Sequence, residues 1–137
     1  MSCILRICGK KTFNIDTFLS SLQLKPSVIH RKGDYSRKIK IVEPQLIFDV
    51  SNAETSDLEK QIKDAIKFLK AHQKELGKAC SIKTIRTMAL DFNFNSRIDQ
   101  KKVAIQYDYF PSELIKLAGN LNLSIWLTQW PYQALKK

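Results

Sequence analysis

The sequence is short of the residue types that build compact chemical sites. Its 137 residues include four glycines, three cysteines and two histidines. Four scattered glycines exclude a glycine-rich phosphate loop, and the three cysteines have neither zinc-ligand spacing nor the even count of a disulfide framework. No apolar run approaches the ~20 residues that span a bilayer. We therefore expect a cytoplasmic protein that holds no metal or cofactor and does not contact a membrane.

Candidate catalytic residues are scarce as well. His30 adjoins two basic residues and His72 is expected on a helix surface, so neither is a good general base beside a nucleophile. A carboxylate pair is the remaining option, because Asp91 and Asp108 fall on the less apolar face of a predicted hairpin and can meet if the register allows. Such carboxylates are more often solvated or bound to Lys or Arg. We predict a non-catalytic protein.

Positive charge is the unusual feature of the composition. Lys and Arg number 23 against 13 Asp and Glu, which gives a net charge of +10. The excess is spread along the chain rather than confined to a tail, so the folded surface itself must be basic. Such a surface attracts nucleic acid, anionic lipid or an acidic protein, and it says nothing about the fold.

Hydrophobic periodicity predicts a single α+β domain over residues 1–137. The expected elements are strands at 3–8, 39–42 and 46–50, a short helix capped by Asn14 or Asp16, a helix at 54–76 ended by Gly77, a hairpin of 85–94 with 103–109, a helix from Pro111 and a strand at 124–129. Residues 24–31 are expected as a loop that leads into a short edge strand. Without that edge strand, the order is β-α-β-β-α-β-β-α-β. This order favours a two-layer sandwich, a mainly antiparallel sheet with helices packed on it, as a ferredoxin-like variant.

A basic segment between two predicted strands is the first candidate binding site. Residues 30–40 combine five basic side chains with one tyrosine, and Gly33-Asp34 in the middle predicts a defined turn. Guanidinium and aromatic groups together are typical of protein interfaces and of base stacking. The candidate contact residues for an acidic protein partner are His30, Arg31, Lys32, Tyr35, Arg37 and Lys38.

A lysine stripe on the long predicted helix supports an alternative. Its members fall within an arc of about 80° at the helical step of 100° per residue, nearly opposite the apolar face. These lysines make a nucleic-acid-binding domain the second hypothesis, although a solvated helix face is the more common reason for such a stripe. The residues proposed for this role are Lys60, Lys63, Lys67, Lys70 and Lys74.

The order of these motifs resembles a known family. The chain combines Leu24-Lys25-Pro26 and Arg31-Lys32-Gly33-Asp34 with a helix start at Pro111-Ser112-Glu113-Leu114. It is similar to an uncharacterised bacterial family, domain of unknown function 4279, over nearly its whole length. The resemblance implies a small intracellular bacterial protein without an established catalytic mechanism. It departs from the family at Ile39-Lys40-Ile41-Val42, where members often carry a tryptophan.

Our leading hypothesis is a cytoplasmic protein-binding module, of which immunity and antitoxin proteins are one type. The expected partner is an acidic protein, and the chain itself is expected as a monomer or a homodimer. Trp126 should face away from Ile125 and Leu127, and the sequence leaves open whether Trp126 and Trp130 are buried.

Overall fold

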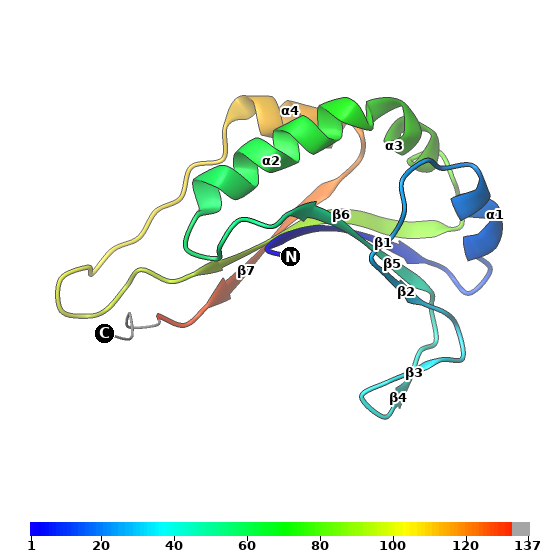
Figure 1. The fold of residues 1–137 in the computed structure, drawn as a ribbon, viewed down its shortest axis with the longest axis horizontal. Helices are drawn as coiled ribbons and strands as arrows, with labels where there is room; N and C mark the ends of the chain where they lie inside the picture. The colour runs from blue at the N-terminus through cyan, green and yellow to red at the C-terminus, as the bar shows by residue number, and fades with distance from the viewer. Residues whose placement is uncertain (133–137) are drawn as a thin grey trace.

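The fold is an open β-sheet with helices on one of its faces (Figure 1). A computed structural model describes residues 1–132 of the chain. The elements along the chain are β1 (Cys3–Gly9), α1 (Ile15–Ser20), β2 (Val28–His30), β3 (Tyr35–Ser36), β4 (Ile39–Lys40), β5 (Gln45–Ser51), α2 (Leu58–Ala71), α3 (Gln73–Ala79), β6 (Ile85–Asn95), α4 (Ser112–Asn120) and β7 (Ser124–Trp130).

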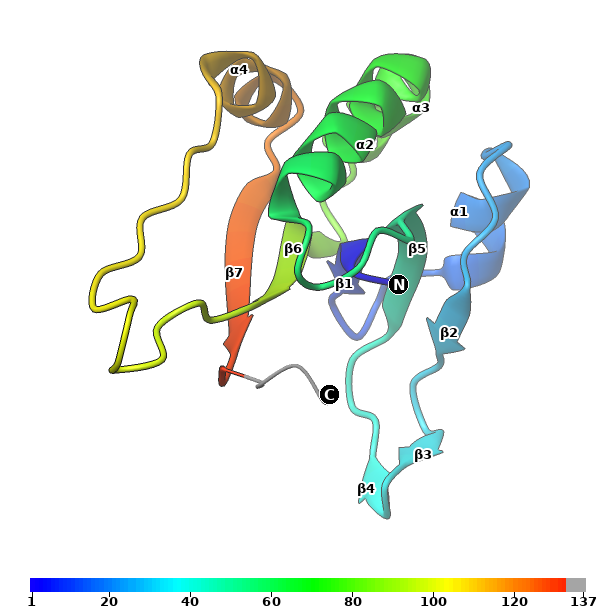
Figure 2. The same ribbon diagram turned by 60° about the vertical axis from the view of Figure 1, so that its left-hand side comes forward.

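The main sheet has five strands in the order β2-β5-β1-β6-β7. All neighbours are antiparallel except β6 and β7, which run parallel because α4 forms the crossover between them. β3 and β4 form a separate two-stranded hairpin that projects from the sheet (Figure 2). The α+β class and the mainly antiparallel sheet are confirmed. The strand count and sheet order differ from the predicted pattern, so the ferredoxin-like variant is not confirmed.

The core lies between the sheet and the helices. Alternate residues of the three central strands point toward α2, α3 and α4, and those of β1 are Cys3, Leu5 and Ile7. Phe48 on β5 and Phe92 on β6 complete a face that is almost fully buried. The opposite face of the sheet has no helix on it in either view (Figures 1 and 2). This arrangement leaves one apolar face and one face with polar groups, as expected for an antiparallel sheet.

The predicted hairpin partner at 103–109 is wrong. These residues form no strand, and β7 occupies the position beside β6. The chain instead leaves β6 through a turn in which the Asp99 carboxylate accepts three backbone N–H bonds, those of residues 101, 102 and 103. Residues 101–110, which we call the strap, then run to α4 along the helix side of the sheet (Figure 1). Periodicity cannot distinguish a strand from an extended strap, because both place alternate side chains on opposite sides.

The long predicted helix at 54–76 is divided in two. It begins later than expected because the Asp57 side chain caps it by accepting the Lys60 N–H. It ends at His72, whose backbone is not helical and whose ring lies 4.7 Å from that of Phe68. The expected C-terminal cap, Gly77, lies inside α3. Apolar periodicity continues across the break, which explains why the sequence predicted one helix.

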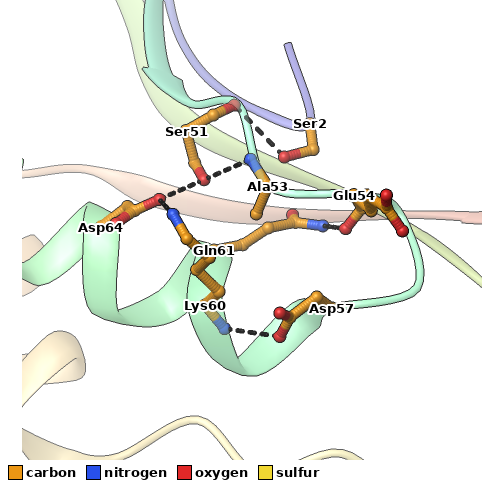
Figure 3. A network of polar contacts seen from close by, with 8 residues as sticks. All are labelled: Ser2, Ser51, Ala53, Glu54, Asp57, Lys60, Gln61 and Asp64. Atoms are coloured by element: carbon orange, nitrogen blue, oxygen red, sulfur yellow. Dashed lines mark hydrogen bonds and ion pairs between the residues drawn. The ribbon is translucent and has the colours of Figure 1, made fainter.

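A polar network fastens the first turns of α2 to the end of β5 (Figure 3). The Ser51 hydroxyl donates to the Asp64 carboxylate at 2.6 Å and accepts the Ala53 N–H at 3.1 Å. Lys60 adds an ion pair to Asp64 at 3.2 Å. The Ser51 hydrogen bond, followed by Lys60, lowers the pKa of Asp64. The carboxylate is therefore held ionised, and it joins the helix to the sheet.

Gln61 makes the second connection between α2 and the sheet. Its side chain is fully buried, and its amide nitrogen donates to the backbone carbonyls of Asn93 at 2.8 Å and Glu54 at 3.4 Å. These bonds satisfy carbonyl groups at the end of β6 and in the loop before α2, which would otherwise be costly to bury. The position of α2 against the sheet is thus fixed by polar as well as apolar contacts.

Candidate functional site

A basic hairpin arm, residues 31–43, projects from the β2 edge of the sheet (Figure 2). Its first turn is closed by the Asp34 N–H donating to the Arg31 carbonyl and by the Asp34 carboxylate accepting the Arg31 N–H. Gly33 has φ +94, a conformation that L side chains rarely adopt. Reciprocal backbone bonds then join Ile41 to Gly33 and Asp34. The defined turn predicted at Gly33-Asp34 is therefore present.

The tip of the arm presents two cations in an unusual backbone conformation. Arg37 and Lys38 have φ values of 49 and 65, as the central residues of a two-residue hairpin turn do. Such turns favour Asn and Gly, because a side chain in this region costs about 1–2 kcal/mol per residue. Tyr35 and Ile39 on either side of the tip are also largely exposed. The tip therefore combines charge, exposed apolar area and backbone strain.

Two exposed ion pairs hold the base of the arm. The Arg31 guanidinium donates to both oxygens of Asp16 on α1, at 2.9 and 3.1 Å. Arg86 on β6 donates to both oxygens of Glu43 in the same way. The bonds from Arg31 lower the pKa of Asp16, and the bonds that Arg86 donates to Glu43 raise the pKa of Arg86. The four other cations of the arm have no ion-pair partner among residues 1–132: Lys32, Arg37, Lys38 and Lys40.

The predicted contact set is therefore only partly gathered on the arm. Lys32, Tyr35, Arg37 and Lys38 lie on it, and Arg31 is engaged at its base. His30 belongs to β2, is half-buried, and lines a hollow of about 270 Å³ beneath the arm. It is a neighbour of the arm rather than part of its exposed surface.

The lysine stripe lies on the exposed side of α2 and extends into α3, but much of its charge is neutralised. Lys60 pairs with Asp64, Lys63 with Glu59 at 3.3 Å, and Lys70 with Glu113 on α4. Lys67 and Lys74 form no ion pair within the described part of the chain. The four lysines on α2 have the predicted helical spacing, whereas Lys74 lies beyond the break at His72, on α3. The acidic neighbour on α4, Glu113, could not be foreseen, because it depends on how two helices pack.

The two predicted carboxylates do not form a pair. Asp91 is 3% exposed on the open face of the sheet, where it accepts from Arg6 at 3.1 Å and from Thr128 at 2.7 Å. Asp108 lies in the strap and is bound by Arg97 at 2.8 Å. They were expected to share a hairpin face, but that hairpin does not exist. The geometry thus removes the carboxylate pair on which the enzyme hypothesis depended.

Aromatic side chains gather around the opposite edge of the sheet, and the sequence interpretation missed them as a surface. Ile105, Tyr107 and Tyr109 alternate along the strap and face solvent, and Tyr107 is 87% exposed. They were expected to alternate along a hairpin strand at 103–109. The sequence did contain a sign of this arrangement, because polar residues alternate with the aromatic ones. On the inner side of the strap, Gln106 accepts the Arg97 N–H and Asp108 pairs with Arg97. A groove of about 580 Å³ separates the strap from α2.

Trp126 and Trp130 lie on the open face of β7 and are exposed over 42% and 51% of their surfaces. Trp126 faces away from Ile125 and Leu127, as predicted. Trp130 donates from its indole nitrogen to the Asn93 side chain at 3.3 Å. The tryptophans therefore extend the apolar surface of the strap around the β7 edge.

Thiol and metal chemistry find little support in the described residues. Burial raises the pKa of the Cys3 thiol, so it stays protonated, and Cys8 and Cys80 are free and half-buried. Cys3 and Cys8 face opposite sides of β1, as expected. Residues 1–132 contain no group of three or more Asp, Glu, His and Cys side chains arranged for a metal ion. Of the described helices, none combines the length and apolarity required to cross a membrane.

The fold and these surfaces define a single-sheet α+β domain with helices on one face and a basic arm at one edge. A family model described as "Domain of unknown function (DUF4279)" matches residues 1–132, and the chain belongs to this family. The family resemblance seen in the sequence motifs is thereby confirmed. Neither a curated protein nor a solved structure matches the chain.

Proposed function

We propose that this DUF4279 protein is a non-catalytic cytoplasmic protein-binding module whose basic arm contacts an acidic partner. The observation that carries the proposal is the arm tip, where Arg37 and Lys38 occupy positions at which Asn and Gly are more stable. A strained conformation at an exposed position is a reason to look for a function there. The strain holds two cations at the furthest point of a hairpin.

The chemistry around the tip supports a protein partner. Tyr35 and Arg37 are residue types that dominate binding energy at protein interfaces. Tyr35 and Ile39 lie on the two strands that flank the tip and expose most of their surfaces. The unpaired cations of the arm add long-range attraction to an acidic surface and raise the association rate at low salt. An immunity or antitoxin protein, which binds and blocks an acidic protein, would use such an arm.

The nucleic-acid alternative has less support. Three of the five stripe lysines already pair with carboxylates, which reduces the charge that a phosphate backbone would meet. The stripe also lacks arginine, the residue that binds phosphate through a planar fork. Lys67 and Lys74 are the two stripe residues on which this alternative still depends.

The test is affinity capture from the native cell extract, with and without nuclease, using the full chain as bait. A captured protein is then purified, and its dissociation constant for the chain is measured by calorimetry. The arm variant R37E/K38E is compared with the stripe variant K67E/K74E, which changes the charge by the same amount on α2 and α3. We expect the arm variant to weaken binding about a hundredfold and the stripe variant to change it little.

Two results would contradict the proposal. Capture of nucleic acid alone, abolished by nuclease and by K67E/K74E, would support the alternative. Equal affinities of both variants for a purified acidic partner would show that the arm is not the contact site. Circular dichroism of each variant confirms that the fold is unchanged.

A further inference from the structure

The two edges of the main sheet differ in how they are protected against pairing with another strand. β2, at one edge, has only three residues, is preceded closely by Pro26 and is followed directly by Arg31. Short length, proline and charge are the usual protections of an edge strand. β7, at the other edge, has seven residues and contains no proline, glycine or charged residue. Pro131 follows β7 directly, but none of these protections lies within the seven residues of the strand.

The outer edge of β7 is open in the structure. Within residues 1–132, the backbone of β7 forms hydrogen bonds only with β6 and with Ser96, which continues it. Leu127 faces the helix side yet is 55% exposed. A hollow of about 350 Å³ adjoins it, lined in part by Phe94, Gln106 and Phe110. The edge thus offers unpaired backbone groups beside an unfilled space lined by both apolar and polar side chains.

We propose that β7 pairs antiparallel with β7 of a second copy of this chain, so that the two sheets become one continuous sheet. A twofold axis normal to the sheet gives antiparallel edges and keeps both helix layers on the same side. With the axis at Leu127, the middle residue, all seven residues of each strand are paired. This interface is independent of the function proposed for the arm, which lies at the other edge of the sheet.

The sequence of β7 is self-complementary in this register. On the open face, Trp126 lies opposite Thr128 and Trp130 opposite Ser124 of the other copy, so each large ring meets a small hydroxyl side chain. On the helix face, Leu127 lies opposite its own counterpart, and each leucine borders the hollow of the other copy. The match of large with small residues is the reason to choose a second copy over an unrelated strand.

Charge also favours this edge for self-association. Two copies that each carry +10 repel one another across most surfaces. β7 is uncharged, and Asp108 of the strap and Arg97 just before it neutralise each other at 2.8 Å. The basic arms stay at the distant edges. Pairing through β7 therefore joins two basic chains along strands that carry no charge themselves.

Sedimentation of the full chain over a concentration series tests the interface. We expect a dimer for the native chain and a dissociation constant at least about a hundredfold higher for L127K, because two buried lysines would face each other. I115K is the matched control, since Ile115 is also exposed but lies on α4. A native chain that is monomeric at every concentration, or an L127K chain as dimeric as the control, would overturn the proposal.

A cysteine pair tests the register separately. In L127C the two new thiols face each other across the axis, and a short bifunctional maleimide should join them. In I125C they are about 13 Å apart along the strands, so the same short reagent should not join them. The native chain, with Cys3, Cys8 and Cys80, gives the background. Equal crosslinking of L127C and I125C would overturn the register.

Discussion

The arm at the β2 edge is charged and attached by exposed contacts, whereas the β7 edge is uncharged and attached to both layers of the fold. The arm is held at its base by Arg31 with Asp16 and by Arg86 with Glu43, all near the surface. β7 is held on the open face through Thr128, which donates to the buried Asp91, and on the helix face through Ile125, which packs against the core. The arm can therefore change with little effect on the fold, and the β7 edge cannot.

The two regions expose candidate binding surfaces in different ways. An arm that carries its own short hairpin can hold strained and charged residues, because their cost stays local. A strand of the main sheet shares its contacts with the core, so its side chains are restricted to those that the core tolerates. The four predictions below test the contrast, and they run from the largest expected effect to the smallest.

The largest effect is expected for R6M on β1. Asp91 is buried, and without Arg6 it keeps only the Thr128 hydroxyl as a side-chain partner. We expect a loss of about 3 kcal/mol in the free energy of unfolding by urea, because a buried charge is left without its counter-ion. R86M at the base of the arm is the matched change, and its loss should be clearly smaller. Similar losses of unfolding free energy in R6M and R86M would contradict the proposed difference between the arm and the β7 edge.

The double variant R6M/D91N shows whether R6M loses stability because a charge is left uncompensated or because packing is lost. If the uncompensated carboxylate is the cause, replacing it by a neutral amide should restore part of the lost stability. If the double variant is as unstable as R6M, the loss comes from the packing of the Arg6 side chain instead.

The second effect is expected for F110A at the end of the strap. The Phe110 ring meets that of the fully buried Phe92 edge-on, with centroids 5.4 Å apart. We expect a loss of about 2 kcal/mol, below the 3–5 kcal/mol of a fully buried phenylalanine. I39A on the arm should change stability by less than about 0.5 kcal/mol, as surface substitutions usually do. Equal effects in urea unfolding would show that the strap is no better anchored than the arm.

A third, smaller effect has the opposite sign. Replacing Arg37-Lys38 by Asn-Gly should stabilise the arm by about 1 kcal/mol, because these residues adopt positive φ at less cost. Amide exchange of Ile41, whose N–H donates to the Asp34 carbonyl at 2.7 Å, reports the stability of the hairpin. In the Asn-Gly variant we expect slower exchange of the Ile41 amide and loss of binding to the acidic partner. Unchanged exchange would mean that the tip carries no strain.

The sequence was a good guide wherever local chemistry decides the structure. Asn14 caps α1, the Gly33-Asp34 turn is present, and β5 lies within one residue of its expected bounds. The strand at 103–109 was wrong because alternation indicates an extended chain and does not say what it pairs with. A parallel pairing of β6 with β7 depends on the α4 crossover, which no local pattern encodes.

The candidate surfaces show the same division. The charge of the arm could be predicted from Arg37 and Lys38, but their strained backbone could not. The spacing of the stripe lysines was visible, but the partner of Lys70 on α4 was not. Trp126 was correctly placed on the face away from Ile125. Its position on an unprotected sheet edge follows only from the strand order.

The smallest expected effect concerns two carboxylates whose pKa values are lowered for different reasons. Arg31 lowers the pKa of Asp16 at the base of the arm, and three backbone N–H groups lower the pKa of Asp99 at the start of the strap. Both carboxylates therefore contribute stability above their unfolded pKa, and this is lost as the pH falls through the folded pKa. R31A should return the pKa of Asp16 toward the usual range and leave Asp99 unchanged, as measured by NMR titration. High salt should act on Asp16 in the same direction, because charge pairs are screened and backbone hydrogen bonds much less so. If R31A left the pKa of Asp16 low, the Arg31–Asp16 ion pair would not be what holds the base of the arm. The difference between the arm and the β7 edge could then not be explained by exposed ion pairs at the arm.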